Sequence, residues 1–166
     1  MRRGELLDFY HGQFREAAGA AHLDTPEKQR AAHQTVATCL QTFADPHRDG
    51  QCRDATPHAL SELPHHQTRA EAWAGLIATL ENIFFLEAKV TCGMAFDLVW
   101  DFDDAIAHLP LDHPKRHSVG LLGNAIRLST MVISTDPNQL MSQLLGRLSP
   151  HEQSSQLRRL IAAATS

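Results

Sequence analysis

The sequence predicts an all-α protein of about eight helices that pack as stacked antiparallel hairpins, in the manner of a helical-repeat superhelix. Two observations support this prediction. Apolar residues recur three and four positions apart in one segment after another, which is the period of an amphipathic helix. Helix-start signals also recur, because Asp24-Thr25-Pro26 and Asp136-Pro137 each place a capping side chain before a proline that suits the first helical turn.

The composition fits a folded helical protein and excludes several classes of partner. With 166 residues, 43% hydrophobic and 20% charged, the chain is long enough for one domain or two small helical units. The net charge is −4 and the Lys and Arg residues are scattered, so we expect no nucleic-acid partner. No apolar run is long enough to span a membrane, and three cysteines without CxxC spacing suit a reducing compartment, which predicts a soluble, cytoplasmic protein with no membrane partner.

Residues 1–44 are expected to form an N-terminal helical pair. Residues 6–11 could be either a short strand remnant or the start of the first helix, and residues 12–22 show a helical apolar spacing. A second helix starts at Pro26 and stops before Asp45-Pro46, because proline disfavours the α conformation in the residue before it. The side chains expected on its buried face are Ala32, Val36, Cys39, Leu40 and Phe43.

Residues 45–57 contain turn formers and charges but almost nothing to bury, so they form the longest expected loop and the best domain boundary. Residues 58–166 would then be a domain of helical hairpins. Pro57 opens its first helix, and Pro64 is expected near the end of that helix or at a kink. Further helices are expected over residues 73–80, 83–92, 95–109, 115–134, 138–148 and 151–164.

Two of these helices have well-defined apolar stripes. The helix at 95–109 is the clearest in the chain, and its expected core residues are Ala95, Leu98, Val99, Phe102, Ala105, Ile106 and Leu109. The helix at 115–134 is expected to bury Leu121, Leu122, Ala125, Leu128 and Val132.

The eleven histidines raise the question of a metal site, with His58, His65 and His66 as the candidate ligands. A zinc site needs three or four converging ligands, and neither a nearby cysteine nor an HExxH motif supplies the remaining ones. His113 and His117 are a helical pair interrupted by Pro114. We therefore favour surface or capping histidines and expect no bound metal and no cofactor.

Acidic and catalytic motifs are also weak. Asp101, Asp103 and Asp104 lack the glycine turn of a calcium loop, which favours a solvated helix face. Glu87 and Lys89 are two positions apart and do not face each other on a helix. Neither a GxxxxGK[ST] loop nor a GxSxG elbow is present, so the sequence predicts a protein that is not an enzyme.

Several stretches occur in the same order as in a known family. They are Phe9–Glu16, Leu23–Lys28, Leu60–His66, Phe85–Lys89, Asp136–Leu140 and Gln143–Leu148. Together they resemble the helical arm of NACHT-type or AAA-like signal-transduction ATPases of the STAND class, many of which carry WD-repeat propellers. Gln67 and Glu71 depart from the leucine and glycine that this family usually has after its Pro-His pair.

The resemblance implies a position rather than a chemistry. Residues 6–16 would match the end of the winged-helix element behind the ATPase core, and the rest would join the ATPase to its sensor. The resemblance thus predicts a non-enzymatic coupling or interaction module, as a fragment, a split subunit or a stand-alone relative. Its partner would be the ATPase or propeller portion of such a system, or a second copy.

Exposed aromatic residues are the candidate contacts for such a partner, namely Phe9, Tyr10, Phe14 and Trp73. The alternative from a different class is a small helical metal- or ligand-binding protein. Its pocket would lie near His65, His66 and Trp73.

Overall fold

The structure is a computed structural model that describes residue 19 and residues 23–148. Within this part of the chain every regular element is a helix, and no strand occurs, which confirms the all-α prediction there. The elements are α2 (Pro26–Ala44), α3 (Pro57–Arg69), α4 (Trp73–Leu80), α5 (Ile83–Thr91), α6 (Ala95–His108), α7 (Arg116–Thr135), η1 (Pro137–Gln139) and α8 (Leu140–Leu148). None of the described helices is both long enough and apolar enough to cross a membrane.

Three of the helix starts are capped by side chains, namely Thr25 for α2, Thr56 for α3 and Asn82 for α5. The Thr25 hydroxyl accepts a hydrogen bond from the Lys28 N–H at 3.3 Å, with Pro26 in the first turn of α2. The Asn82 side chain accepts from the Phe84 N–H at 3.0 Å and so caps α5. Helix α3 does not stop at Pro64 but continues to Arg69.

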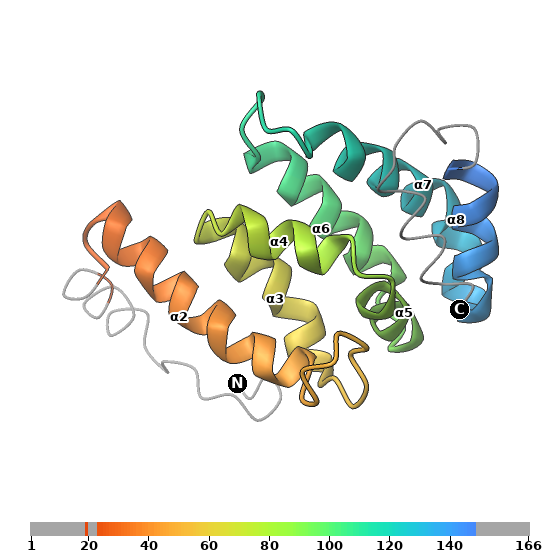
Figure 1. Cartoon of the computed structure of the whole chain (residues 1–166), viewed down its shortest axis with the longest axis horizontal. Coiled ribbons are helices and arrows are strands. Elements are labelled where there is room, and N and C mark those ends of the chain that lie inside the picture. The colour runs from red at the N-terminus through yellow and green to blue at the C-terminus, as the bar shows by residue number, and fades with distance from the viewer. Residues whose placement is uncertain (1–18, 20–22, 149–166) are drawn as a thin grey trace.

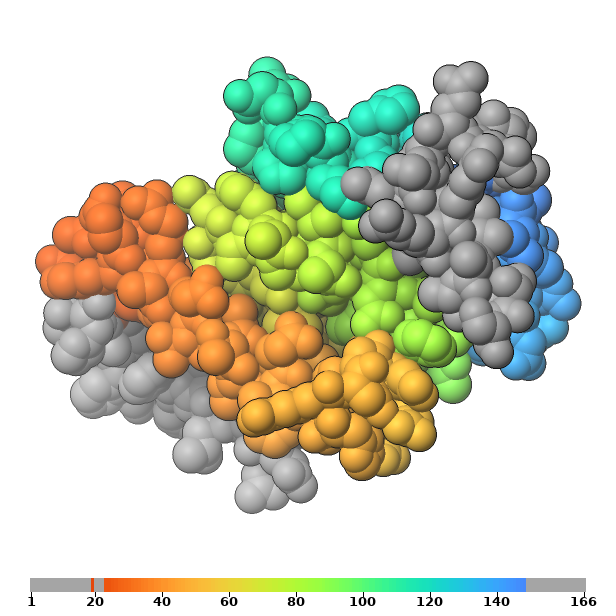
Figure 2. All heavy atoms as spheres, in the orientation of Figure 1, coloured from red at the N-terminus to blue at the C-terminus, as the bar shows by residue number. Residues whose placement is uncertain are grey.

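The helices pack as hairpins, as predicted. Helix α2 packs mainly on α3, α6 packs on α7, and α7 packs in turn on α8. Helix α3 also contacts α4, α5 and α6, so it joins the α2 end of the molecule to the α7–α8 end (Figure 1). In the space-filling view the side chains of α2 lie next to those of α4 in the centre of the face shown (Figure 2).

The apolar core contains side chains from every described α-helix, from α2 to α8. Its largest fully buried apolar side chains are Phe85, Phe102, Leu60, Leu63, Leu76, Leu80, Leu86, Leu98, Leu122, Ile126 and Ile133. The predicted stripe of α6 is confirmed, because Leu98, Phe102 and Ala105 are buried. A Cβ added to Gly123 of α7 would lie 3.0 Å from the Phe102 Cβ, so these two helices are in close contact.

The predicted buried face of α2 is wrong by about one position. Of the five residues expected inside only Leu40 is buried, while Val36, Cys39 and Phe43 are exposed. The buried residues beside Leu40 are Ala37 and Ala44. Helical periodicity allows both stripes, and the alanine side lets α2 approach α3 closely because its side chains are small.

The predicted core of α7 is wrong at Leu128 and Val132, which are exposed. Ser129 and Thr130 are buried in their place. Each hydroxyl donates to the carbonyl four residues earlier in its own helix, at 2.7 Å for Ser129 and 2.9 Å for Thr130. The helix therefore satisfies these hydroxyls itself, which removes the penalty for burying them.

Several predictions concern residues outside the described part of the chain. These are the strand remnant at residues 6–11, most of the helix at 12–22, the helix at 151–164, and the contact residues Phe9, Tyr10 and Phe14.

Candidate functional site

The predicted histidine pair is part of a three-histidine cluster between α2 and α3. His65 and His66 come from α3, and His33 comes from α2. The Nδ1 atoms of His33 and His66 are 2.9 Å apart, and the rings of His33 and His65 have centroids 5.9 Å apart. His58, the third predicted candidate, is exposed on the first turn of α3. Nothing in the local sequence around His33 indicated this long-range contact.

The surroundings of His33 and His66 favour neutral imidazoles at these two positions. Burial lowers the pKa of His33, and the neighbouring charges of His65 and Arg69 lower it further. Burial also lowers the pKa of His66, followed by the repulsion from His33 and His65. A hydrogen bond between two Nδ1 atoms requires one protonated and one unprotonated nitrogen, so the contact exists only if at least one ring is neutral.

Metal binding finds no support from this geometry. Among the described residues no group of three or more His, Cys, Asp or Glu side chains is arranged so that it could hold a metal ion. The cluster is therefore best described as a hydrogen-bonded contact between two helices.

Trp73 lies half-buried at a groove of about 470 Å³, next to the histidine cluster. The groove is lined by Pro26, Gln29, Arg30, His33, Thr68, Arg69, Glu71, Trp73, His108 and Pro110. Both of its arginines already have carboxylate partners, with Arg30 at 3.1 Å from Glu71 and Arg69 at 3.0 Å from Asp104. These ion pairs leave the groove without a strong charge for a small ligand.

The acidic run of α6 forms three separate ion pairs rather than one solvated face. Asp103 pairs with Arg127 of α7, and Asp104 pairs with Arg69 of α3. Asp101 pairs with Lys89 of α5, whose side chain is fully buried. The prediction of a solvated face is therefore wrong at Asp101.

The Lys89–Asp101 pair lies inside the core. Burial raises the pKa of the Asp101 carboxyl to about 7, against the attraction of the Lys89 ammonium, which lowers it. Buried ion pairs of this kind contribute little net stability but are costly to break. The pair links α5 to α6, and Lys89 therefore pairs with Asp101 rather than with Glu87.

Helices α6 and α7 both expose large apolar side chains. Trp100 of α6 is 72% exposed and Met131 of α7 is 73% exposed. Phe96 and Leu128 are exposed as well. We call these four residues the α6–α7 face.

Helical spacing places Phe96 and Trp100 on one side of α6, and Leu128 and Met131 on one side of α7. Phe96 precedes Trp100 by one helical turn, and Trp100 precedes Asp103 by three residues. The Asp103–Arg127 ion pair fixes the antiparallel register of the two helices. Met131 follows Arg127 by one turn, and therefore lies opposite Trp100.

Both helices thus have apolar side chains on two sides. Leu98 and Phe102 of α6 and Ile126 of α7 face the core, while the α6–α7 face points outward. Single exposed apolar residues are ordinary, but a contiguous group suggests an interaction site. The signal was present in the sequence, because Phe96 and Trp100 are off the predicted core stripe of α6.

Comparison with known proteins gives little further information. No family model matches the sequence, and no solved structure matches it. The chain is similar to part of telomerase protein component 1 from Rattus norvegicus, with 24% identity over 144 residues. The aligned region covers 86% of this chain and 6% of that protein, so the chain spans a small fraction of its relative's length.

Proposed function

We propose that the chain is a non-enzymatic helical coupling and interaction module that binds a protein partner through the α6–α7 face. The main support is the exposure of Trp100 and Met131 on two helices that pack on each other and whose opposite sides already fill the core. Tryptophan is the residue type most enriched in interface hot spots, and methionine adapts easily to a partner's shape.

The surroundings of this face suit a protein interface. The Asp103–Arg127 ion pair lies at its edge, with both side chains partly exposed, and so provides a polar rim to an apolar centre. Burying one large apolar side chain contributes roughly 1.5–3 kcal/mol. Four such residues therefore provide an apolar centre for a contact.

The proposed partner is the ATPase or propeller portion of a STAND-type system, and self-association is the alternative. The resemblance of the ordered sequence stretches to the STAND helical arm supports this choice. The similarity to a short part of a much longer protein is also in keeping with one module among several. In such an arm, packed hairpins shift as discrete units and so transmit movement between attached domains.

We place the module in the cytoplasm, where cysteines stay reduced. Cys39, Cys52 and Cys92 are all free thiols.

Tryptophan fluorescence tests the proposal directly, since the chain contains two tryptophans. Trp73→Phe leaves Trp100 as the sole tryptophan, which is excited selectively at wavelengths where tyrosine does not absorb. We expect its emission to shift to shorter wavelength when a purified ATPase or propeller portion of a STAND-type protein is added. A shift that instead grows with the concentration of the chain alone would identify self-association.

Substitutions in the face supply the control. Trp100→Ser is expected to weaken partner binding at least tenfold, as measured by calorimetry. A hot-spot tryptophan contributes about 2 kcal/mol or more to the binding free energy. Leu111→Ser is the matched control, because Leu111 is exposed in the turn between the two helices and lies outside the face. Equal loss in both variants, or no loss with Trp100→Ser, would show that the partner binds elsewhere.

A further inference from the structure

Helix α2 has two apolar sides, and the core covers only one of them. The buried side carries Ala37, Leu40 and Ala44. A second apolar row, with spacings of four, three and four positions, consists of Ala32, Val36, Cys39 and Phe43. The first of these residues is half-buried and the other three are exposed. We call these four residues the α2 outer row.

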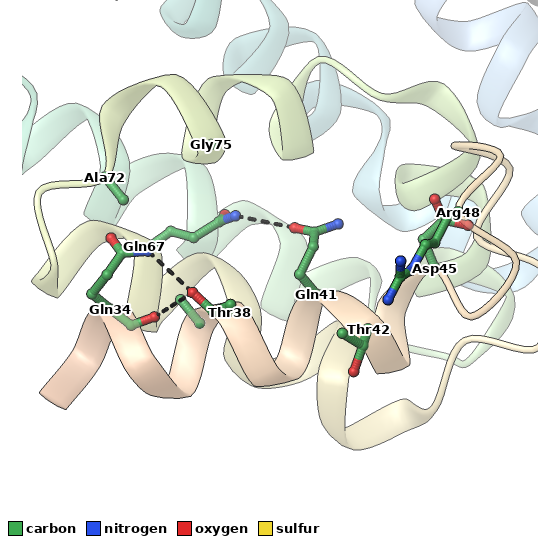
Figure 3. Close-up of a pocket in the computed structure, with 10 residues that line it drawn as sticks. Gln34, Thr38, Gln41, Thr42, Asp45, Arg48, Gln67, Ala72 and Gly75 are labelled. Carbon is green, nitrogen blue, oxygen red and sulfur yellow. Dashed lines mark hydrogen bonds between the residues drawn. The ribbon is translucent and has the colours of Figure 1, made fainter.

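The outer row lies on a side of α2 that neither α3 nor α4 covers. Its centre is about 110° around the helix axis from the buried side that packs on α3, at about 100° per residue. The polar side chains Gln34, Thr38 and Gln41 occupy a third side, where they border a groove toward Gly75 of α4 (Figure 3). The outer row is therefore an apolar helix side without a partner among the described helices.

The chain enters α2 through a turn that is fixed to the helix. The Leu23 N–H donates to the Gly19 carbonyl at 2.7 Å, which is the four-residue spacing of a helical turn. The Leu23 carbonyl in turn accepts a hydrogen bond from the Gln29 side chain at 2.9 Å. Only two residues lie between Leu23 and the start of α2. Helices joined by so short a connection pack as an antiparallel pair.

The sequence before this turn supplies a matching apolar row. Residues 12–22 are expected to be helical, and residues 6–11 could be the start of the same helix. As one helix, this segment places on one side, at spacings of four, four, three and four, the residues Leu6, Tyr10, Phe14, Ala17 and Ala21. Positions at equal distances from the turn lie side by side in an antiparallel pair. Tyr10 then comes level with the part of α2 that holds Val36 and Cys39.

The short connection favours this segment over a second copy of the chain as the occupant of the outer row. A tethered segment has an effective concentration on the order of millimolar for a short linker. A second copy would in addition lose translational and rotational freedom on binding.

We propose that residues 6–22 fold as one helix that packs antiparallel on the α2 outer row and covers Val36, Cys39 and Phe43. Tyr10 and Phe14, two of the predicted partner contacts, are then used within the chain. The α6–α7 face remains the surface for a protein partner, and it shares no residue with the outer row.

The three cysteines allow a test in the full chain. Cys39 lies in the outer row, Cys92 is exposed at the end of α5, and Cys52 is buried. Burial raises the pKa of the Cys52 thiol to about 11, so this thiol should react only when the protein unfolds. We expect a bulky maleimide to label Cys39 about tenfold more slowly than Cys92, as measured by mass spectrometry of the digested protein.

Two substitutions in the segment show whether it provides this protection. Phe14→Asp places a charge in the proposed contact and should raise the labelling rate of Cys39 about tenfold. Glu16→Lys is the matched control, because residue 16 lies about 200° around the expected helix from residue 14 and should leave Cys39 protected. Cys52 should stay unlabelled in both variants, which shows that the core remains folded. Trp100→Ser should leave Cys39 protected even if it abolishes partner binding, so the two proposals can fail separately.

A disulfide identifies the segment that covers Cys39. Tyr10→Cys should form a disulfide with Cys39 inside one chain on mild oxidation, because such a bond needs Cβ atoms about 4 Å apart. Asp8→Cys is the control, since residue 8 lies about 200° around the expected helix from residue 10 and should form this bond several-fold less. Peptide mapping identifies the bond, and a denaturing gel shows whether it joins one chain or two.

Three results would overturn the proposal. They are equal labelling rates of Cys39 in the unsubstituted chain and in Phe14→Asp, equal disulfide yields of Tyr10→Cys and Asp8→Cys, and protection of Cys39 that increases with protein concentration. The last result would assign the outer row to a second copy of the chain.

Discussion

The α2–α3 contact and the α6–α7 contact are both antiparallel helix hairpins, but different kinds of side chain hold them together. Between α6 and α7, Phe102 lies against Gly123 amid leucines and isoleucines of the core. Between α2 and α3, the only residues that α2 buries are Ala37, Leu40 and Ala44. The remaining contacts from α2 include polar ones, such as His33 with His66 and Gln41 with Gln67.

This difference predicts different stability for the two ends of the molecule. Apolar burial provides most of the free energy of folding, and alanines provide little of it. Helix α2 should therefore open locally at a lower free energy than the α5–α8 core, which opens only on global unfolding.

The largest expected effect is on the core, at the Lys89–Asp101 pair. Lys89→Met leaves a buried carboxyl group without its partner and should destabilise the protein by about 3–5 kcal/mol at pH 8, measured by urea unfolding. The loss should be smaller at pH 5, where the Asp101 carboxyl binds a proton, because its pKa is already raised to about 7.

The double variant Lys89→Met with Asp101→Leu is the control for this prediction. It removes both charges and should recover most of the stability, because well-packed apolar residues often replace a buried ion pair without cost. If the single variant is as stable as the wild type, the pair is not buried as described.

A smaller effect is expected from the close contact of α6 and α7. Gly123→Ala places a methyl group 3.0 Å from the Phe102 Cβ and should cost about 1–3 kcal/mol, read from the midpoint of urea unfolding. Gly120→Ala on the same helix is the matched control, since its Cβ would lie 3.8 Å from the Ile106 side chain, an ordinary contact. It should be neutral or stabilising by up to about 1 kcal/mol through helix propensity. Equal effects of the two substitutions would contradict the close contact.

Local sequence signals predicted the helices but not all of their neighbours. Proline with a capping residue marked the start of α2, and the apolar stripe of α6 marked its buried side, because both signals act within one or two turns. On α2 and α7, the sequence was compatible with burial of either of two adjacent stripes. Which stripe is buried depended on the side that packs against another helix.

Local sequence signals were even less able to predict the pairs of residues in the candidate site. His33 with His66 and Lys89 with Asp101 are pairs between different helices, and only the packing of those helices brings them together. Phe96 and Trp100 could have been found from the sequence, because a tryptophan outside a helix's apolar stripe is itself a sign of an exposed contact residue.

The smallest expected effect concerns the pH dependence of the two ends, which should have opposite signs. Burial lowers the pKa values of His33 and His66 in the folded state, so below pH 6.5 the unfolded chain binds protons that the folded chain does not. The α2–α3 contact is therefore fully stable above that pH and weakens as the pH falls through the folded pKa values. Asp101 acts in the opposite direction, because its raised pKa makes the folded core bind a proton between about pH 4 and 7, and this contribution is lost as the pH rises.

Hydrogen exchange, corrected for the intrinsic pH dependence of the exchange rate, separates the two regions because it reports each helix individually. Lowering the pH from 7.5 to 5.5 should increase the opening of α2 amides relative to those of α6.

The charged groups that also act on the cluster are His58, Glu62, His65, Arg69 and Asp104. Of these, Glu62 opposes the decrease in the His66 pKa. His66→Asn should remove most of the α2 effect, while His47→Asn in the exposed loop should preserve it. If α2 and α6 respond alike to pH, the histidine contact does not control the stability of α2, and the two hairpins differ only in the amount of apolar surface that they bury.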